Sequence, residues 1–258
     1  MIEMILIFIF GLIIGSFLNC VIWRLYKEES FIEGKSYCPH CHHSLNFWDL
    51  FPVLSFVFLM GKCRYCKGKI SIQYPLVELA TATMFVLTYL SLGSLISLQL
   101  AFWLIMMAFF IIIFVFDLKY FIIPDEVIYS AIFLSIAYLL YSFYIGAIDM
   151  HQVILTILSA LGASLFFFLI WFFSKGMAMG FGDVKLALLI GLLLGFPNTI
   201  VGLFLGFLLG AIIGSVMVFL KKKGMGSEVP FAPFLVAGAT ICFFFGNNIV
   251  NWYLTLRF

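Results

Sequence analysis

Charged residues are scarce in this sequence. Of its 258 residues, 10% are charged and 65% are hydrophobic, whereas a soluble domain carries about 25% charged residues. The chain therefore lacks the polar side chains that a water-facing surface requires. Together with a mean hydropathy of +1.20, this excludes a soluble globular class and indicates that lipid surrounds most of the chain.

Several motifs are also missing. The sequence has no phosphate-binding loop, no Gly-rich dinucleotide fingerprint, and no Ser or Cys nucleophile beside a plausible base. Nothing beyond one basic loop points to nucleic acid, so we expect no nucleic-acid partner. The first residues, Met1-Ile2-Glu3, lack the basic segment of a cleavable signal peptide. We therefore expect residues 4–23 to form a retained span.

Long apolar runs separated by polar breaks are the dominant pattern. A helix needs roughly 20 apolar residues to cross a bilayer core. The pattern predicts an all-α polytopic membrane protein with about eight transmembrane helices. The sixth is short, and Pro197 and Asn198 mark its turn into the seventh. The expected spans are 4–23, 72–92, 98–116, 127–146, 152–173, 184–196, 199–220 and 233–254.

The basic residues are segregated along these spans. If the N-terminus lies outside, thirteen of the fourteen Lys and Arg fall on one side, and only Arg257 does not. The positive-inside rule then predicts that both termini lie outside and that the basic loops are cytoplasmic. These thirteen residues are Arg24, Lys27, Lys35, Lys62, Arg64, Lys67, Lys69, Lys119, Lys175, Lys185, Lys221, Lys222 and Lys223.

Four glycines spaced four residues apart lie in the seventh span. Such spacing puts small residues on one helix face and allows close backbone approach. We expect this face, formed by Gly202, Gly206, Gly210 and Gly214, to pack tightly against another helix.

The long polar segment 24–71 contains two Cys-x-x-Cys pairs. Two such turns complete a tetrahedral sulfur site that suits structural Zn²⁺, and disulfides are rare in the cytoplasm expected for this loop. An iron-type site, or His40, His42 or His43 in place of a thiolate, is the alternative. Cys20 and Cys242 lie in apolar runs and are expected to pack. The predicted ligands are Cys38, Cys41, Cys63 and Cys66.

Two aspartates stand at the predicted cytoplasmic boundary of the membrane. Asp117 ends the third span, where the macrodipole of its own helix disfavours an anion, so capping of that helix does not explain it. An ion pair with Lys119 is the simple alternative. Asp183 begins the sixth span, where it is also a good helix cap. Because the two share one depth, we expect them to form a dyad in which one carboxylate activates water and the other polarises a carbonyl.

Three further residues are weaker candidates for the site. Asp125 follows Pro124 and is more typical of a helix start. Glu78 is an acid inside the second span that needs a partner, and Asn19 of the first span lies at a comparable depth. Contact with a substrate amine is a further hypothesis for Glu78. In the segment 180–185, Gly180 and Gly182 leave room for an extended substrate beside Asp183.

With these motifs in place, the chain closely resembles the bacterial prepilin peptidases, also called type IV leader peptidases, of the GxGD aspartyl protease class. The resemblance covers nearly the whole chain, with Ala232 where the family usually has Gly and Leu50 in place of a common Asn. It implies Asp117 and Asp183 as the catalytic pair. The matching segments are 11–19, the two Cys pairs, 52–55, 74–79, Asp117 with 123–125, 180–185 (which includes Lys185) and 229–234.

The resemblance also implies a function. The substrate would be a prepilin or pseudopilin with a short basic leader, cut at the cytoplasmic face of the bacterial membrane. Bifunctional members then N-methylate the new terminus with S-adenosylmethionine, and the four-cysteine domain accompanies that type. We expect three parts: a first helix (1–23), a zinc domain (24–71) and a protease domain (72–258). A relative of presenilin or signal-peptide peptidase, or an ion or metal transporter with a zinc loop, are the alternatives.

Overall fold

The computed structural model describes residues 2–30, 36–93, 96–220 and 229–255. Five of the basic residues in the charge argument lie outside these ranges: Lys35, Lys221, Lys222, Lys223 and Arg257. The chain forms two compact units, Met1–Ile112 and Ile113–Phe258, which are described separately here. This division does not test the three expected parts, whose boundaries remain a prediction.

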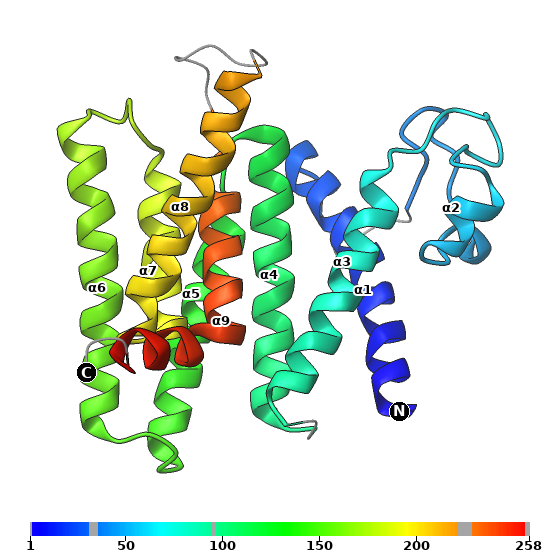
Figure 1. Ribbon diagram of the computed structural model, residues 1–258. Coiled ribbons are helices and arrows are strands. Elements are labelled where there is room, and N and C mark those ends of the chain that lie inside the picture. The colour runs from blue at the N-terminus through cyan, green and yellow to red at the C-terminus, as the bar shows by residue number, and fades with distance from the viewer. Residues whose placement is uncertain (1, 31–35, 94–95, 221–228, 256–258) are drawn as a thin grey trace. The chain divides into compact units, whose positions relative to one another are not determined.

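The described residues are almost entirely helical (Figure 1). Between the long helices, the described part of the chain adds one 3-10 turn, one short helix and two isolated β-bridges, Tyr37 with Ser44 and Lys62 with Lys69. In chain order the elements are α1 (Ile2–Lys27), η1 (Phe47–Asp49), α2 (Leu54–Phe58), α3 (Gln73–Ser91), α4 (Leu98–Tyr120), α5 (Asp125–Tyr144), α6 (Met150–Phe173), α7 (Phe181–Leu194), α8 (Asn198–Phe219) and α9 (Ala232–Thr255).

Each of the eight apolar runs forms a long helix, so the expected all-α polytopic architecture is confirmed. Six of the helices are long and apolar enough to cross a membrane, and α3 and α7 fall short of that measure. The 14 residues of α7 span about 21 Å, less than a bilayer core of about 30 Å. The count of eight spans is therefore approximate.

Helices α1 and α3 of the first unit lie side by side at two glycines. A Cβ on Gly11 would come within 2.5 Å of the Ala82 Cα, and one on Gly15 within 2.6 Å of the Glu78 Cα. Only glycine allows two backbones to approach so closely in lipid. This packing brings the middle of α1 against the first half of α3.

Helix α7 is the buried centre of the second unit. It contacts α5, α6, α8 and α9, and Leu186, Leu189 and Ile190 are fully buried. A short helix surrounded by other helices satisfies its backbone without having to match the bilayer thickness. Its buried residues, which begin at Asp183, therefore lie in a protein environment and not in lipid.

The glycine face on α8 packs against α9, but only over part of its length. Gly202 and Gly206 come close to the α9 backbone, whereas nothing lies within 4 Å of a Cβ on Gly214. The closest approach comes from the α9 side, where a Cβ on Gly238 would lie 2.4 Å from the Gly202 carbonyl oxygen. The expected tight packing is present, and its centre is a glycine that the spacing argument did not include.

Candidate active site and metal centre

Asp117 is a buried carboxylate near the end of α4. Its Oδ2 accepts a hydrogen bond of 3.2 Å from the backbone N–H of Ala232, the first residue of α9. The free N–H groups at a helix start carry partial positive charge and stabilise an anion. Asp117 therefore caps a helix other than its own, which the argument from its own macrodipole did not consider. The Lys119 amine, its partner in the simple alternative, lies over the ring of Tyr120.

Asp183 is the third residue of α7, and Gly180 is the N-cap of that helix. The Asp183 carboxylate is buried and accepts a hydrogen bond from the backbone N–H of Gly180. It also lies close enough to Asp117 for the two carboxylates to interact electrostatically. The structure thus brings together two acids that are 66 residues apart. Asp183 lies in the first turn of its own helix α7, and Asp117, near the end of α4, contacts the first residue of α9.

The two glycines before Asp183 have different surroundings. A Cβ on Gly182 would lie 3.1 Å from the Cβ of Ile123, in the turn that joins α4 to α5. A Cβ on Gly180 would meet nothing closer than 3.9 Å, and its nearest neighbour would be the Asp183 carboxylate. Gly182 therefore allows the α4–α5 turn to pack against the start of α7, whereas Gly180 leaves open space beside the acid.

Lys185, two residues after Asp183 on α7, forms an ion pair with Asp125 of α5. Lys185 Nζ donates to Asp125 Oδ1 at 2.6 Å and lies over the rings of Tyr129 and Phe181. Asp125 is the first residue of α5 and follows the N-cap Pro124, as the helix-start reading predicted. Together with the contact between Gly182 and Ile123, the pair fixes the start of α5 on both sides of Asp183. The sequence reading considered these two residues without pairing them.

Glu78 and Asn19 are both buried in the first unit, but each has other partners. The Glu78 Oε2 accepts a 2.7 Å hydrogen bond from the Val53 backbone N–H, and Glu78 also bonds the Ser16 side chain. Asn19 donates to the Tyr74 carbonyl oxygen at 3.1 Å. The partner of Glu78 is thus Val53, in the loop between α1 and α3. The similar depths of Glu78 and Asn19 in the sequence did not indicate this contact.

The four predicted cysteine ligands form one cluster in that loop. Their sulfur atoms all lie within 4.8 Å of one another, and Cys38 Sγ lies 3.9 Å from Cys66 Sγ. Tetrahedral zinc with bonds of about 2.3 Å would place its sulfur ligands about 3.8 Å apart, so the spacing fits. Backbone N–H groups of Cys66 and Tyr65 lower the pKa of the Cys63 thiol to about 7, whereas, against a hydrogen bond from the Gly68 backbone, burial and the neighbouring cysteines raise the pKa of the Cys66 thiol to about 11. Cys63 is therefore the sulfur of this pair that ionises first. No histidine belongs to the cluster in the described part of the chain.

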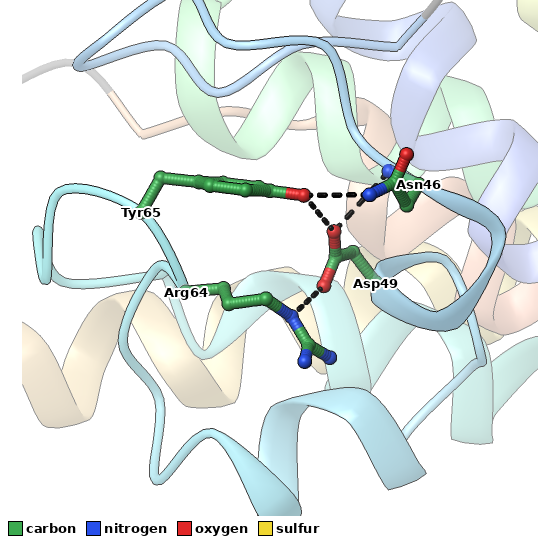
Figure 2. Close-up of polar contacts among 4 residues, drawn as sticks. All are labelled: Asn46, Asp49, Arg64 and Tyr65. Carbon is green, nitrogen blue, oxygen red and sulfur yellow. Dashed lines mark hydrogen bonds and ion pairs between the residues drawn. The ribbon is translucent and has the colours of Figure 1, made fainter.

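A polar network joins the second cysteine turn to the segment between the pairs (Figure 2). Asp49 accepts from Arg64 Nε at 2.6 Å and from the Tyr65 hydroxyl at 3.2 Å, and Asn46 Nδ2 donates to that hydroxyl at 2.9 Å. Burial works to raise the pKa of Asp49, but these hydrogen bonds and that from the Asn46 backbone hold it below its usual range. The segment between the two pairs is therefore fixed to the second cysteine turn.

Comparison with known proteins agrees with this arrangement. The family model for the bacterial peptidase A24 N-terminal domain matches residues 9–92, and the model for the type IV leader peptidase family matches residues 104–215. This chain belongs to the type IV leader peptidase family. A prepilin leader peptidase/N-methyltransferase of Bacillus subtilis (strain 168) is 34% identical over 97% of this chain and 98% of its own. One of Aeromonas hydrophila is 31% identical over 97% of this chain and 93% of its own. No solved structure matches.

The two matched regions of this leader peptidase contain different candidate groups. The N-terminal model covers the cysteine cluster and Glu78, and the leader peptidase model covers Asp117, Asp183 and Lys185. Ala232, which donates to Asp117, lies beyond residue 215 and so outside both matched regions. The hydrogen bond between Ala232 and Asp117 is therefore identified by the structure and not by the family match.

Replacing Gly182 with alanine should lower both the Tm and the peptidase activity of this family member. The new methyl group presses on Ile123, which adjoins the helix carrying Asp117, so the separation of the two acids changes. Because a small misplacement of reacting groups slows catalysis strongly, we expect the cleavage rate to fall about ten-fold or more. Thermal unfolding in detergent and a prepilin cleavage assay measure the two effects. Gly180→Ala is the matched control, for which we expect an unchanged Tm, so any loss of cleavage there reports on substrate access. Equal Tm values for both variants would contradict this packing.

Replacing Cys38 with serine should release the metal from the loop of this peptidase. A site of three thiolates and a weakly coordinating hydroxyl loses most of its affinity, and a loop without an apolar core of its own depends on the metal for its fold. Metal analysis of purified protein should find about one zinc per chain in the parent and little in the variant. Cys20→Ser is the control and should keep its metal. Full zinc occupancy in Cys38→Ser would contradict the four-thiolate site.

Proposed function

We propose that this chain cleaves the leader peptide of type IV prepilins or pseudopilins through an aspartate dyad, Asp117 and Asp183, and then N-methylates the new terminus. The observation that carries the proposal is the pairing of two buried carboxylates from different helices within the segment matched by the leader peptidase family. Relatives that carry both activities in their names cover nearly the whole chain. The same similarity favours this proposal over an ion or metal transporter.

Two neighbouring carboxylates can share the work of peptide hydrolysis. Since two close negative charges repel each other, one acid stays protonated while the other is ionised. The ionised carboxylate takes a proton from water, which attacks the scissile carbonyl, and the protonated one donates a hydrogen bond to the developing oxyanion. The tetrahedral intermediate then collapses as a proton passes to the leaving amine. The Ala232 N–H at the α9 start supports an anion on Asp117 without an external cation.

The proposed topology puts this chemistry at the cytoplasmic face of the bacterial membrane. The segregation of Lys and Arg supports outside termini and a cytoplasmic cysteine loop. Asp117 lies near one end of α4, and Asp183 lies in the first turn of α7. A dyad at helix ends is accessible to a short basic leader in the cytoplasm, while the hydrophobic helix of the prepilin stays in lipid.

The cysteine cluster is proposed to hold a structural zinc ion. Its four sulfurs have the right number, type and spacing, and four protein ligands leave no open position for substrate. The metal would stabilise the loop between α1 and α3 and take no part in peptide cleavage. Methylation would draw on S-adenosylmethionine as the methyl donor.

Mass analysis of a prepilin that has been incubated with reconstituted protein and S-adenosylmethionine tests the proposal directly. Reconstituted protein should remove the leader and add one methyl group, about 14 mass units, to the new N-terminus (one CH₂, by reaction arithmetic). Cleavage without the mass increase would contradict the methylation half alone. A prepilin that remains full length with folded, membrane-inserted protein would contradict the proposed protease function.

A further inference from the structure

The segment between the two cysteine pairs has an unusually apolar exposed surface. Residues 47–60, here called the aromatic segment, contain η1 and α2. Four of its large side chains are 71 to 86% exposed, namely Phe47, Trp48, Phe58 and Met60, and Leu54 and Val57 are more than half exposed. Large apolar patches on a protein surface mark an interaction site. The exposed surface of the aromatic segment is therefore expected to have a binding partner.

The aromatic segment is anchored at two points, the end of η1 and the start of α2, so a loose loop does not explain its exposure. Asp49 ties η1 to the second cysteine turn through Arg64 and Tyr65 (Figure 2). Val53, the N-cap of α2, donates its backbone N–H to Glu78. Val53 also has a φ of +59°, a strained conformation that is rare for a β-branched residue. The bond to Glu78 helps to hold this turn in place.

The same bond indicates the depth of the aromatic segment. Glu78 is the sixth residue of α3, and it bonds to Ser16 of the neighbouring α1. Ser16 lies eight residues, or about 12 Å along the helix, from Arg24, the first basic residue after the apolar run of α1. A Glu side chain leans toward the start of its own helix, so Val53, which Glu78 binds, lies at a depth between those of Ser16 and Arg24. The N-terminus of α2 is therefore below the basic end of α1, at the depth of the membrane interface.

The residues that follow the aromatic segment are basic. Lys62, Arg64, Lys67 and Lys69 lie within nine residues of Met60, and all four are exposed. Lipid head groups attract such residues next to a hydrophobic segment. Tryptophan and aromatic side chains prefer the boundary between acyl chains and head groups. Depth, charge and side-chain type thus agree on one occupant, the bilayer interface.

We propose that the aromatic segment lies in the membrane interface on its own side of the bilayer, with Phe47, Trp48 and Phe58 among the acyl chains. Glu78 sets its depth by holding Val53, and the segment links the metal centre to the membrane in addition to α1 and α3. This proposal does not depend on leader cleavage, because it rests on contacts within the first unit alone.

Lipid-attached quenchers test this placement in the full-length protein. The parent and Trp48→Phe are reconstituted in vesicles of phosphatidylcholine and phosphatidylglycerol, and their difference in emission isolates Trp48 from the other four tryptophans. Since Trp48 is largely exposed, this change leaves the fold intact. We expect lipids brominated high on the acyl chain to remove about half or more of the Trp48 emission, and to quench it more than lipids brominated near the chain end. Acrylamide in the water phase should have little effect.

Two other results would overturn the proposal. Quenching by acrylamide but not by brominated lipid would place Trp48 in water. Protection from both quenchers would mean that protein covers it, either residues 113–258 or a second copy of the chain. Glu78→Ala supplies a further check, because loss of the bond to Val53 should weaken lipid quenching of Trp48. Unchanged quenching in that variant would contradict the role of Glu78 in setting depth.

Discussion

Replacing Asp117 or Asp183 with asparagine is expected to abolish leader cleavage while the protein still inserts and folds. Asparagine has the shape of aspartate but neither takes nor supplies the proton that the dyad requires. General acid–base chemistry alone contributes about 10²–10⁴-fold, so we expect a loss of at least about 10²-fold. An asparagine at position 117 can still accept the Ala232 N–H through its oxygen, and one at position 183 can still accept the Gly180 N–H. Neither change should therefore lower the Tm.

The measurement is the initial rate of prepilin cleavage by reconstituted protein at equal membrane content. Glu126→Gln is the matched control, because this exposed acid in the first turn of α5 is also close to the membrane boundary. It should cleave at the parental rate. If either aspartate variant also cleaves at that rate, the dyad is misassigned. If all three variants lose cleavage, the loss follows from removing a negative charge at this membrane face, and the dyad assignment is not supported.

Features that depend on local patterns could be predicted from the sequence. Apolar runs of span length became helices, and two Cys-x-x-Cys turns formed one cluster, because hydrophobic length and paired turns impose their geometry locally. The shared position of Asp117 and Asp183 at helix ends came from the same span pattern. Asp125 likewise begins α5 because proline and acidic residues favour a helix start.

Features that depend on which helices are neighbours could not be predicted. Ala232 is 115 residues from Asp117, and a span pattern gives the depth of a residue but not the helix beside it. The same limit applies to Lys185 with Asp125, and to Glu78 with Val53. Asp117 and Glu78 both accept hydrogen bonds from backbone N–H groups. Because every residue except proline has such a group, no sequence pattern identifies the donor.

The packing of α8 against α9 gives a second large expected effect, because it connects the fold to the dyad. Gly238→Ala places a methyl group 2.4 Å from the Gly202 carbonyl oxygen and 2.5 Å from the Gly206 nitrogen. Both atoms are backbone of α8, so the helices must separate. Overpacking costs about 1–3 kcal/mol, which corresponds to a fall in Tm of about 2–12 °C for a chain of this size.

The effect of Gly238→Ala should extend to cleavage. Gly238 lies six residues, or about 9 Å along the helix, from Ala232, whose N–H donates to Asp117. A displaced α9 withdraws that donor, so the cleavage rate should fall together with the Tm. Gly214→Ala is the matched control on α8, where the methyl group enters open space and the higher helix propensity of alanine should leave the Tm equal or raise it. Tm values that change alike in both variants would show that the close contact between α8 and α9 does not support the site.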